Sequence, residues 1–260
     1  MKTITYNLNQ NRHIKPKNKQ ELGHFLAGLI DADGHIDRTG QSITINSHSR
    51  DKAVAYYIKK VVGGYIYKYK KVNAWRFTST KKQGLICLSR LICNKLRLPY
   101  KIDQFNTRLA PRYPDLKLER LSIKSMQMDH WFAGFVQGDG CFQIKVRKPR
   151  KPGWNHQVEI VLAIELKQES LLKQIKANFG GLICYRQSRD TYHYNSVNLQ
   201  NATKLVKYFD NYQVMGPSYR LYLCWRRALD IVLSKEHLTY AGLVEIKCLK
   251  AYMTQLRQSV

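Results

Sequence analysis

The chain has 260 residues, enough for one large domain or for two of about 110 to 130 residues. Its 44 Lys and Arg outnumber 18 Asp and Glu, so the formal net charge at pH 7 is +26. This surplus favours a nucleic acid partner. A membrane partner is not expected, because the basic residues are spread along the chain and no apolar run approaches the ~20 residues that span a bilayer.

The N-terminal residues 1–20 predict a basic arm, with neither the apolar core of a secretory signal nor the pattern of a transit peptide. A thirteen-residue phrase follows. It reads HFLAGLIDADGHI from His24 to Ile36 and returns as HWFAGFVQGDGCF from His130 to Phe142. This internal repeat predicts two similar halves. We place them at residues 21–108 and at 128–260, which includes C-terminal helices, with a linker at 109–127 that contains two prolines.

Each half has the same predicted order: helix, two strands, helix, two strands, helix. In the first half, QSITINSHS alternates apolar with polar residues, which is typical of a half-buried strand. Asp51 is expected to cap the next helix, and the pair Gly63–Gly64 to end it. Strands at Tyr65–Lys70 and Ala74–Ser79 and a helix at Gln83–Leu96 complete the unit.

The second half repeats this order. Strands are predicted at CFQIKVRK, HQVEIVLAIEL, LICYRQS and TYHYNSVNL, and helices at Glu169–Gly181 and Asn201–Tyr212. Its extra length falls in the segment RKPRKPGWN, Arg147–Asn155. This basic hairpin loop is expected to reach for phosphates.

The repeated phrase predicts two helices that pack closely on each other. Small residues recur at matching positions: Ala27, Gly28, Ala32, Ala133, Gly134 and Gly138. They allow two helix backbones to approach about a pseudo-twofold axis. Gly34 and Gly140 are expected to end the helices in the left-handed conformation that glycine accepts. This places Asp33 and Asp139 at the two helix tips.

Paired carboxylates at helix C-termini repel each other and face the negative ends of the helix dipoles. Protonation or a divalent cation stabilises such a pair, and hard oxygen ligands favour Mg²⁺. Asp33 and Asp139 therefore predict metal-assisted phosphodiester hydrolysis. Counted from Leu26 and from Phe132, the sixth position is Asp31 in one half and Gln137 in the other, so only the eighth position, Asp33 and Asp139, keeps its charge in both.

The phrase resembles the signature of the LAGLIDADG homing endonucleases, which Leu26 to Gly34 spell residue for residue. From about Glu21 onward, element order and spacing are similar to the single-chain, two-repeat form. The resemblance implies an α+β fold of two pseudo-symmetric αββαββα repeats, packed through the two LAGLIDADG helices. Each repeat would have a four-stranded antiparallel sheet that forms half of a DNA-binding saddle.

The same resemblance implies a monomer that cuts both strands of double-stranded DNA at a long, pseudo-palindromic or asymmetric site. It implies two or three Mg²⁺ ions, for which Mn²⁺ or Ca²⁺ can substitute in binding. Asp33 and Asp139 would bind these ions together with the adjacent Gly34 and Gly140.

Other residues near the metal follow from the resemblance. A lysine at the start of the helix after the fourth strand is expected there, and Lys101 supplies it. The matching stretch of the second half has Ser218, with Arg220 two residues on, so the two cleavage sites are expected to differ. Asp51 and Gln168 are expected to hold metal-bound water, with His48 and Glu165 as alternatives.

The outer faces of the strands are expected to read DNA sequence, because side chains two apart line one face and can enter the major groove. In the first half we assign this role to Ser42, Thr44, Asn46, Lys68, Lys70, Arg76 and Thr78. In the second half we assign it to Gln143, Lys145, Arg147, Arg186, Ser196 and Asn198.

Two alternatives stand beside the endonuclease: a group I intron maturase that binds intron RNA, and a catalytically inactive DNA-binding protein. The retained acids favour the endonuclease, because binding to a polyanion alone would be helped by replacing them. The run KEHLTYAGLVEIKCLK, Lys235–Lys250, is similar to the tail of organelle intron-encoded members. This implies a protein encoded and made in a mitochondrion or a chloroplast.

Overall fold

The computed structural model describes residues 13–70, 72–114, 116–122, 124–149, 151 and 155–258. Most of the predicted N-terminal arm, up to residue 12, lies outside these residues, as does the middle of the basic loop at 147–155. Within the described ranges, no helix has the length and apolar character needed to cross a membrane.

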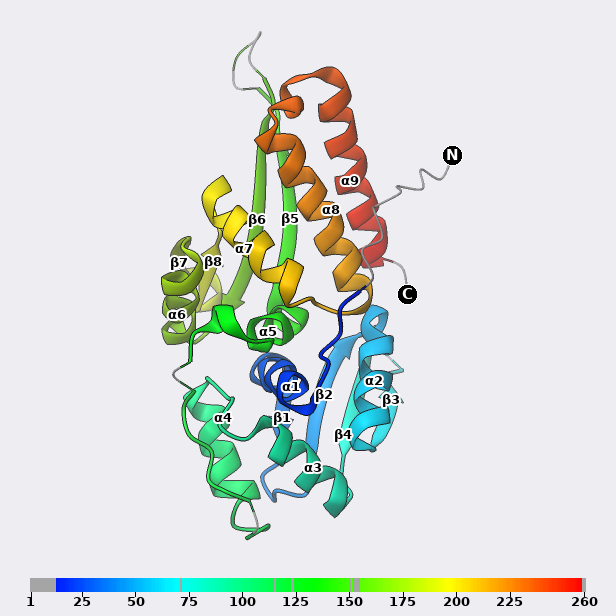
Figure 1. The fold of residues 1–260 in the computed structure, drawn as a ribbon, viewed down its shortest axis with the longest axis vertical. Helices are drawn as coiled ribbons and strands as arrows, with labels where there is room; N and C mark the ends of the chain where they lie inside the picture. Colours follow the sequence, from blue (N-terminus) through cyan, green and yellow to red (C-terminus); the bar gives the residue numbers. More distant parts are fainter. Residues whose placement is uncertain are drawn as a thin grey trace.

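Each half contains one four-stranded antiparallel sheet (Figure 1). The first sheet consists of β1 (Gly34–Ile36), β2 (Ile43–His48), β3 (Tyr65–Lys68) and β4 (Ala74–Ser79), in the order β1-β2-β4-β3. The second consists of β5 (Gly140–Arg147), β6 (Gln157–Leu166), β7 (Leu182–Arg186) and β8 (Thr191–Asn195), in the order β5-β6-β8-β7. The equivalent orders confirm the predicted α+β fold of two repeats.

The helices follow the same repeat. The first half has α1 (Lys19–Asp33), α2 (Lys52–Val62), α3 (Lys82–Ile92), α4 (Pro99–Gln104) and a π-helix at Phe105–Leu109. The second half has α5 (Trp131–Asp139), α6 (Glu169–Phe179), α7 (Leu199–Asn211), α8 (Gly216–Leu233) and α9 (Tyr240–Gln258). Figure 1 shows α1 and α5 side by side at the centre of the molecule. The predicted helix Gln83–Leu96 corresponds to α3, and α4 was not predicted as a separate helix, although Pro99 is typical of a first helical turn.

The segment 109–127 is packed rather than extended between the halves. Several of its apolar side chains are buried: Leu109, Ala110, Tyr113, Leu116 and Met126. The carboxylate of Glu119 accepts hydrogen bonds from the backbone N–H groups of residues 94–96 at 2.6, 2.8 and 3.2 Å. This segment is therefore attached to the first repeat where α3 gives way to α4.

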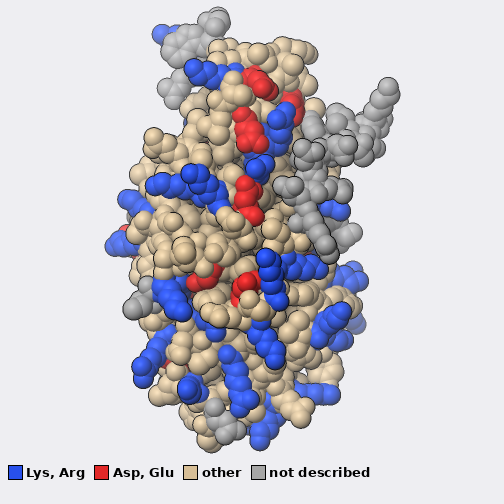
Figure 2. Space-filling model, in the orientation of Figure 1, with Lys and Arg blue, Asp and Glu red and all other residues tan. Residues whose placement is uncertain are grey.

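Surface charge is distributed unevenly. On the face seen in Figure 2, Lys and Arg cover much of the lower half, where α1, α3 and α4 lie, and Asp and Glu are few there. In the upper half, where α8 and α9 lie, Asp and Glu stand among the basic side chains.

The contact between α1 and α5, which we call the helix seam, depends on two equivalent glycines. A Cβ added at Gly28 would lie 1.9 Å from the carbonyl oxygen of Trp131, and one at Gly134 would lie 1.9 Å from that of Phe25. Both distances are far below van der Waals contact, so only glycine fits. The predicted pairing of the helices through small residues is confirmed.

Gly34 and Gly140 do not end their helices as expected. Their φ angles are −80° and −87°, so neither is left-handed and that prediction was wrong. Glycine is needed at both positions because a larger side chain would clash with the preceding turn of the helix. A Cβ at Gly34 would lie 2.6 Å from Ile30 Cα, and one at Gly140 would lie 2.4 Å from Val136 Cγ1.

We expect Gly134→Ala to lower the free energy of unfolding by about 3 kcal/mol, at the upper end of overpacking costs because the obstructing atoms are backbone. Gly63→Ala is the control. Gly63 has no neighbouring atom within 4 Å but a φ of 75°, so it should cost only about 1 kcal/mol of backbone strain. Urea denaturation measures both, and equal losses would contradict the role of the helix seam.

Candidate active site

Asp33 and Asp139 are the last residues of α1 and α5, so the helix seam brings the two acids together. A Cβ at Gly138 would lie 2.8 Å from Asp33 Oδ2, which places this carboxylate against the tip of α5. Burial, with the charges of Asp139 and Asp51, raises the pKa of Asp33 to about 7. Burial raises the pKa of Asp139 to about 6. A divalent cation would offset both negative charges.

The donor set suits a hard cation bound by few protein ligands. No group of three or more His, Cys, Asp and Glu side chains is placed to hold a metal in the part of the chain that the structure describes. Asp33 and Asp139 would thus supply a minority of the ligands, and water or phosphate oxygens would complete the shell. The carbonyl of Gly34 already accepts a hydrogen bond from Lys101 Nζ.

Lys101 is buried in the first turn of α4 and directs its ammonium group to the tip of α1. Burial lowers the pKa of Lys101, and the charges of Asp31, Asp139 and Asp33 oppose this effect. The lysine therefore lies at the acids, as predicted. We expected Lys101 at the start of the helix that directly follows the fourth strand. That placement was wrong, because α3 lies between β4 and α4.

The second half lacks this cation. Ser218 is the third residue of α8, as Lys101 is of α4. Its buried Oγ accepts a hydrogen bond from Gln137 Nε2 at 3.1 Å. Arg220 is exposed. The two halves therefore differ at this position, as the sequence predicts.

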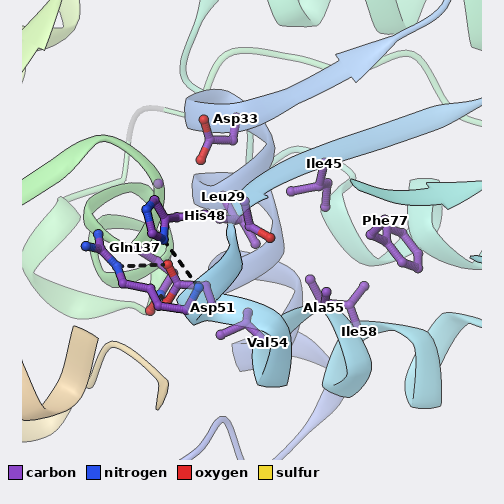
Figure 3. A pocket seen from close by; sticks show the side chains of 13 residues that line it. Leu29, Asp33, Ile45, His48, Asp51, Val54, Ala55, Ile58, Phe77 and Gln137 are labelled. Carbon is purple, nitrogen blue, oxygen red and sulfur yellow. Dashed lines mark hydrogen bonds and ion pairs between the residues drawn. The ribbon is translucent and has the colours of Figure 1, made fainter. Parts of the chain in front are cut away.

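A small cavity of about 50 Å³ lies beside Asp33, between α1, β2 and α2 (Figure 3). His48, Asp51 and Gln137 lie at its polar end. Gln137 Nε2 donates to Asp51 Oδ1 at 3.0 Å, and burial raises the pKa of Asp51 to about 6. The opposite wall is apolar and includes Leu29, Ile45, Val54, Ala55, Ile58 and Phe77. Asp33, His48 and Asp51 therefore line the same cavity.

Asp51 and Gln168 occupy equivalent places, immediately before α2 and α6. Neither side chain caps its helix, so the predicted capping by Asp51 was wrong. Its carboxylate is engaged by Gln137 and by Arg50 instead. Glu165, the alternative to Gln168, lies on the second sheet and pairs with arginines there.

Asp31 of α1 and Gln137 of α5, at equivalent positions of the repeat, hold the starts of α4 and α8. The carboxylate of Asp31 accepts from the backbone N–H of Arg97 at 2.8 Å and from Trp131 Nε1 at 2.9 Å. In the second half, Gln137 Oε1 accepts from the N–H of Met215 at 2.7 Å. These roles were missed. A polar residue inside an otherwise apolar buried helix was the signal that could have indicated them.

Comparison with known proteins identifies the family of this chain. Residues 132–229 match the family model described as LAGLIDADG endonuclease, and residues 20–63 match the one described as LAGLIDADG-like domain. A relative in Schizosaccharomyces pombe, named "Uncharacterized cox1 intron-2 37.2 kDa protein", is 41% identical over 91% of this chain and 74% of its own length. The chain belongs to the LAGLIDADG endonuclease family.

This LAGLIDADG protein is also similar to a second curated protein and to a solved structure. "Probable intron-encoded endonuclease 3" of Neurospora crassa is 29% identical over 50% of this chain and 25% of its own length. A solved structure of I-SmaMI, described as bound to uncleaved DNA target in the presence of calcium ions, superposes with a TM-score of 0.69 at 20% identity. It covers 89% of this chain and 98% of that one. The structural likeness supports the fold.

Strand register decides which side chains share the outer face of the first LAGLIDADG sheet. Thr44 pairs with Thr78, and Asn46 with Arg76, so these four predicted residues lie together. Arg76 Nε and the hydroxyl of Tyr69 both donate to Asn46 Oδ1 at 3.2 Å. Ser42, just before β2, continues the same alternation.

Two predicted residues of β3 do not belong to this face. Lys68 pairs with Trp75 on the helix side, where Lys52 Nζ lies 5.0 Å from the Trp75 ring centre. Lys70 lies beyond the end of β3. The outer face instead carries the exposed Tyr65 and Tyr67. The partly buried Ile66 between them is the signal that could have set the alternation.

The second sheet presents Gln143, Lys145 and Arg147 from β5, which alternate with the inward-facing Phe142, Ile144 and Val146. Arg147 pairs with Glu159 at 3.1 Å. Arg186, from β7, pairs with Glu165 at 3.0 Å. These four predicted residues lie outside the core. A bound polyanion would repel the acidic partners of the two arginines.

Ser196 was wrongly assigned to this face. It is fully buried, and its Oγ accepts from the backbone N–H of Leu162 at 2.8 Å. Asn198 caps α7 by accepting from the N–H of Asn201 at 2.8 Å. The outer face of β8 carries His193 and Asn195 instead.

We expect Arg76→Ala to relax discrimination at one or two base pairs of a DNA site, costing about 1–3 kcal/mol if its contact is bidentate to guanine. Cleavage profiling over all single-base variants of the site measures this. Ser196→Ala is the control, because its buried hydroxyl should affect stability and leave base preference unchanged. Identical profiles for Arg76→Ala and the parent would exclude Arg76 from sequence readout.

Proposed function

We propose that this chain is a site-specific, intron-encoded DNA endonuclease that hydrolyses both strands with divalent metal ions. The juxtaposition of Asp33 and Asp139 at the two tips of the helix seam carries the proposal. Their raised pKa values mark a site that a cation would stabilise. The name of the Neurospora relative and the DNA and calcium ions of the I-SmaMI structure support it.

A divalent cation bound at the aspartates would supply Lewis-acid stabilisation of the phosphate and a more acidic water. Side chains of the protein would position the reactants and offset charge. Asp33 and Asp139 would hold the cation at the reacting phosphates, and Asp51 and Gln168, immediately before α2 and α6, would hold water through hydrogen bonds. Lys101 offsets negative charge as it develops on the phosphate. Because metal binding requires deprotonated aspartates, affinity for metal should rise as the pH passes through about 6 to 7.

The two outer sheet faces define the DNA that fits. They belong to repeats related by the helix seam, so we infer one duplex that spans both sheets of a single monomer. The residues proposed to contact it are those that remain on the outer faces: Ser42, Thr44, Asn46, Arg76, Thr78, Gln143, Lys145, Arg147 and Arg186. Because the S. pombe relative is named for a cox1 intron, we propose a mitochondrial origin.

The decisive experiment incubates the protein with a duplex that joins the two exons flanking its intron, with Mg²⁺ or with chelator. Double-strand cleavage at the junction in Mg²⁺ alone is expected. Tight binding that weakens steeply with salt, yet without cleavage in any divalent metal, would favour the inactive DNA-binding alternative. Binding to intron RNA with no affinity for the exon junction would favour the maturase.

A further inference from the structure

A hollow of about 710 Å³ opens where α1 begins, α2 ends and α3 runs past them. Its lining contains basic, amide and apolar side chains and no acid: Lys19, Gln20, Val61, Gln83, Ile86, Cys87, Arg90, Leu91 and Lys95. The apolar ones form an accessible surface, since Val61 is 40% exposed. The hollow therefore combines cations with an apolar wall.

This hollow lies far from the proposed cleavage site. Lys19 and Asp33 are the first and last residues of α1, and a helix of 15 residues at a rise of 1.5 Å per residue is about 22 Å long. The acids lie at one end of α1 and the hollow at the other. A duplex held on the outer sheet faces at the acids does not reach it.

Two of the three cations of the hollow are not paired with a carboxylate, whereas Lys95 is attracted to that of Glu119. Lys19 and Arg90 form no ion pair with any carboxylate within the described ranges, and α2 and α3 contain no acid. Lys95 Nζ donates to the carbonyl of Cys93 at 3.1 Å. In the second half, by contrast, arginines of α8 pair with acids: Arg226 with Asp210 at 3.0 Å and Arg227 with Glu245 at 2.8 Å.

We propose that this hollow binds an unpaired nucleotide of a folded RNA. Phosphates would lie on Lys19, Arg90 and Lys95, and the base against Val61 and Ile86. A DNA duplex keeps its bases stacked and offers only phosphates, whereas loops and bulges of RNA expose whole bases to protein. The amides of Gln20 and Gln83 can donate to and accept from a base edge. This RNA site is separate from DNA cleavage and does not depend on it.

The test uses a fluorescein-labelled RNA hairpin with an unpaired loop, and its fluorescence anisotropy at physiological salt. We expect the double variant Lys19→Glu/Arg90→Glu to weaken hairpin binding by about tenfold, from loss and reversal of phosphate contacts. The control is Lys204→Glu/Lys207→Glu, which makes the same charge change at exposed positions of α7, the counterpart of α3. It should weaken binding by less than about threefold. Thermal unfolding verifies that both variants are folded.

A second variant separates base binding from charge. Val61→Ser keeps every cation, and should weaken binding of the looped hairpin by about threefold while leaving a loop-free RNA duplex of the same stem unaffected. Excess unlabelled exon-junction DNA should not displace the hairpin. The proposal is overturned if that DNA displaces the hairpin, if the two double variants weaken binding equally, or if Val61→Ser has no effect.

Discussion

Asp33→Asn or Asp139→Asn is expected to abolish double-strand cleavage, with a rate loss of at least about 10³-fold, while DNA affinity stays the same or rises. Each change removes a metal ligand and a negative charge that faces phosphate, but it keeps the shape of the side chain. A plasmid carrying the site distinguishes uncut, nicked and linear DNA. Linear product at the parental rate from either variant would remove the proposed mechanism.

Stability measurements control for misfolding. The pKa of Asp33 is raised from 3.8 to about 7 in the folded protein. The folded state therefore loses stability relative to the unfolded state as the pH rises through this window and the carboxyl group ionises. Without metal, the parent should therefore lose stability between pH 4 and pH 7 more than Asp33→Asn does. Asp230→Asn, an exposed site on α8, should leave cleavage unchanged.

Lys101→Met is expected to slow cleavage of one strand by about 10²-fold, because only one half of the site has a buried ammonium group beside the acids. Ser218→Ala should change neither rate by more than about threefold, since this hydroxyl contacts Gln137 and carries no charge. The parental enzyme should accordingly pass through a nicked intermediate. Labelling each strand separately measures both rates, and an equal slowing of both strands by Lys101→Met would contradict this asymmetry.

The sequence predicted those features that local patterns determine. The doubled phrase predicted the helix seam, because small residues at helical spacing allow close approach, and it placed Asp33 and Asp139 at the tips. Alternation predicted β4 at its observed bounds, Ala74–Ser79. The helix that we predicted to end at Leu96 ends at Ile92. The prediction ran too far because a second helix starts only a few residues later, at Pro99.

What the sequence did not predict depends on pairing between distant segments. Lys68 and Tyr67 are adjacent, and the register of β3 against β4 turns Tyr67 outward and Lys68 to the helix side, which among local features only Ile66 indicates. Ser196 follows the last residue of β8 and turns into the core, which the composition of the strand does not reveal. The bond between Gln137 and Asp51 joins residues 86 positions apart in different repeats, where no local rule applies.

The helix seam also makes the two repeats non-interchangeable. The buried carboxylate of Asp31 accepts a hydrogen bond from the indole of Trp131 in the other repeat. Phe25 takes the place of Trp131 in the first repeat and has no N–H to donate. Two first repeats paired with each other would each bury an aspartate without this partner, at about 1–3 kcal/mol apiece. A symmetric homodimer of this half would thus be less stable than the native pairing, and a chimera that joins it to another half should keep the aspartate and its tryptophan together.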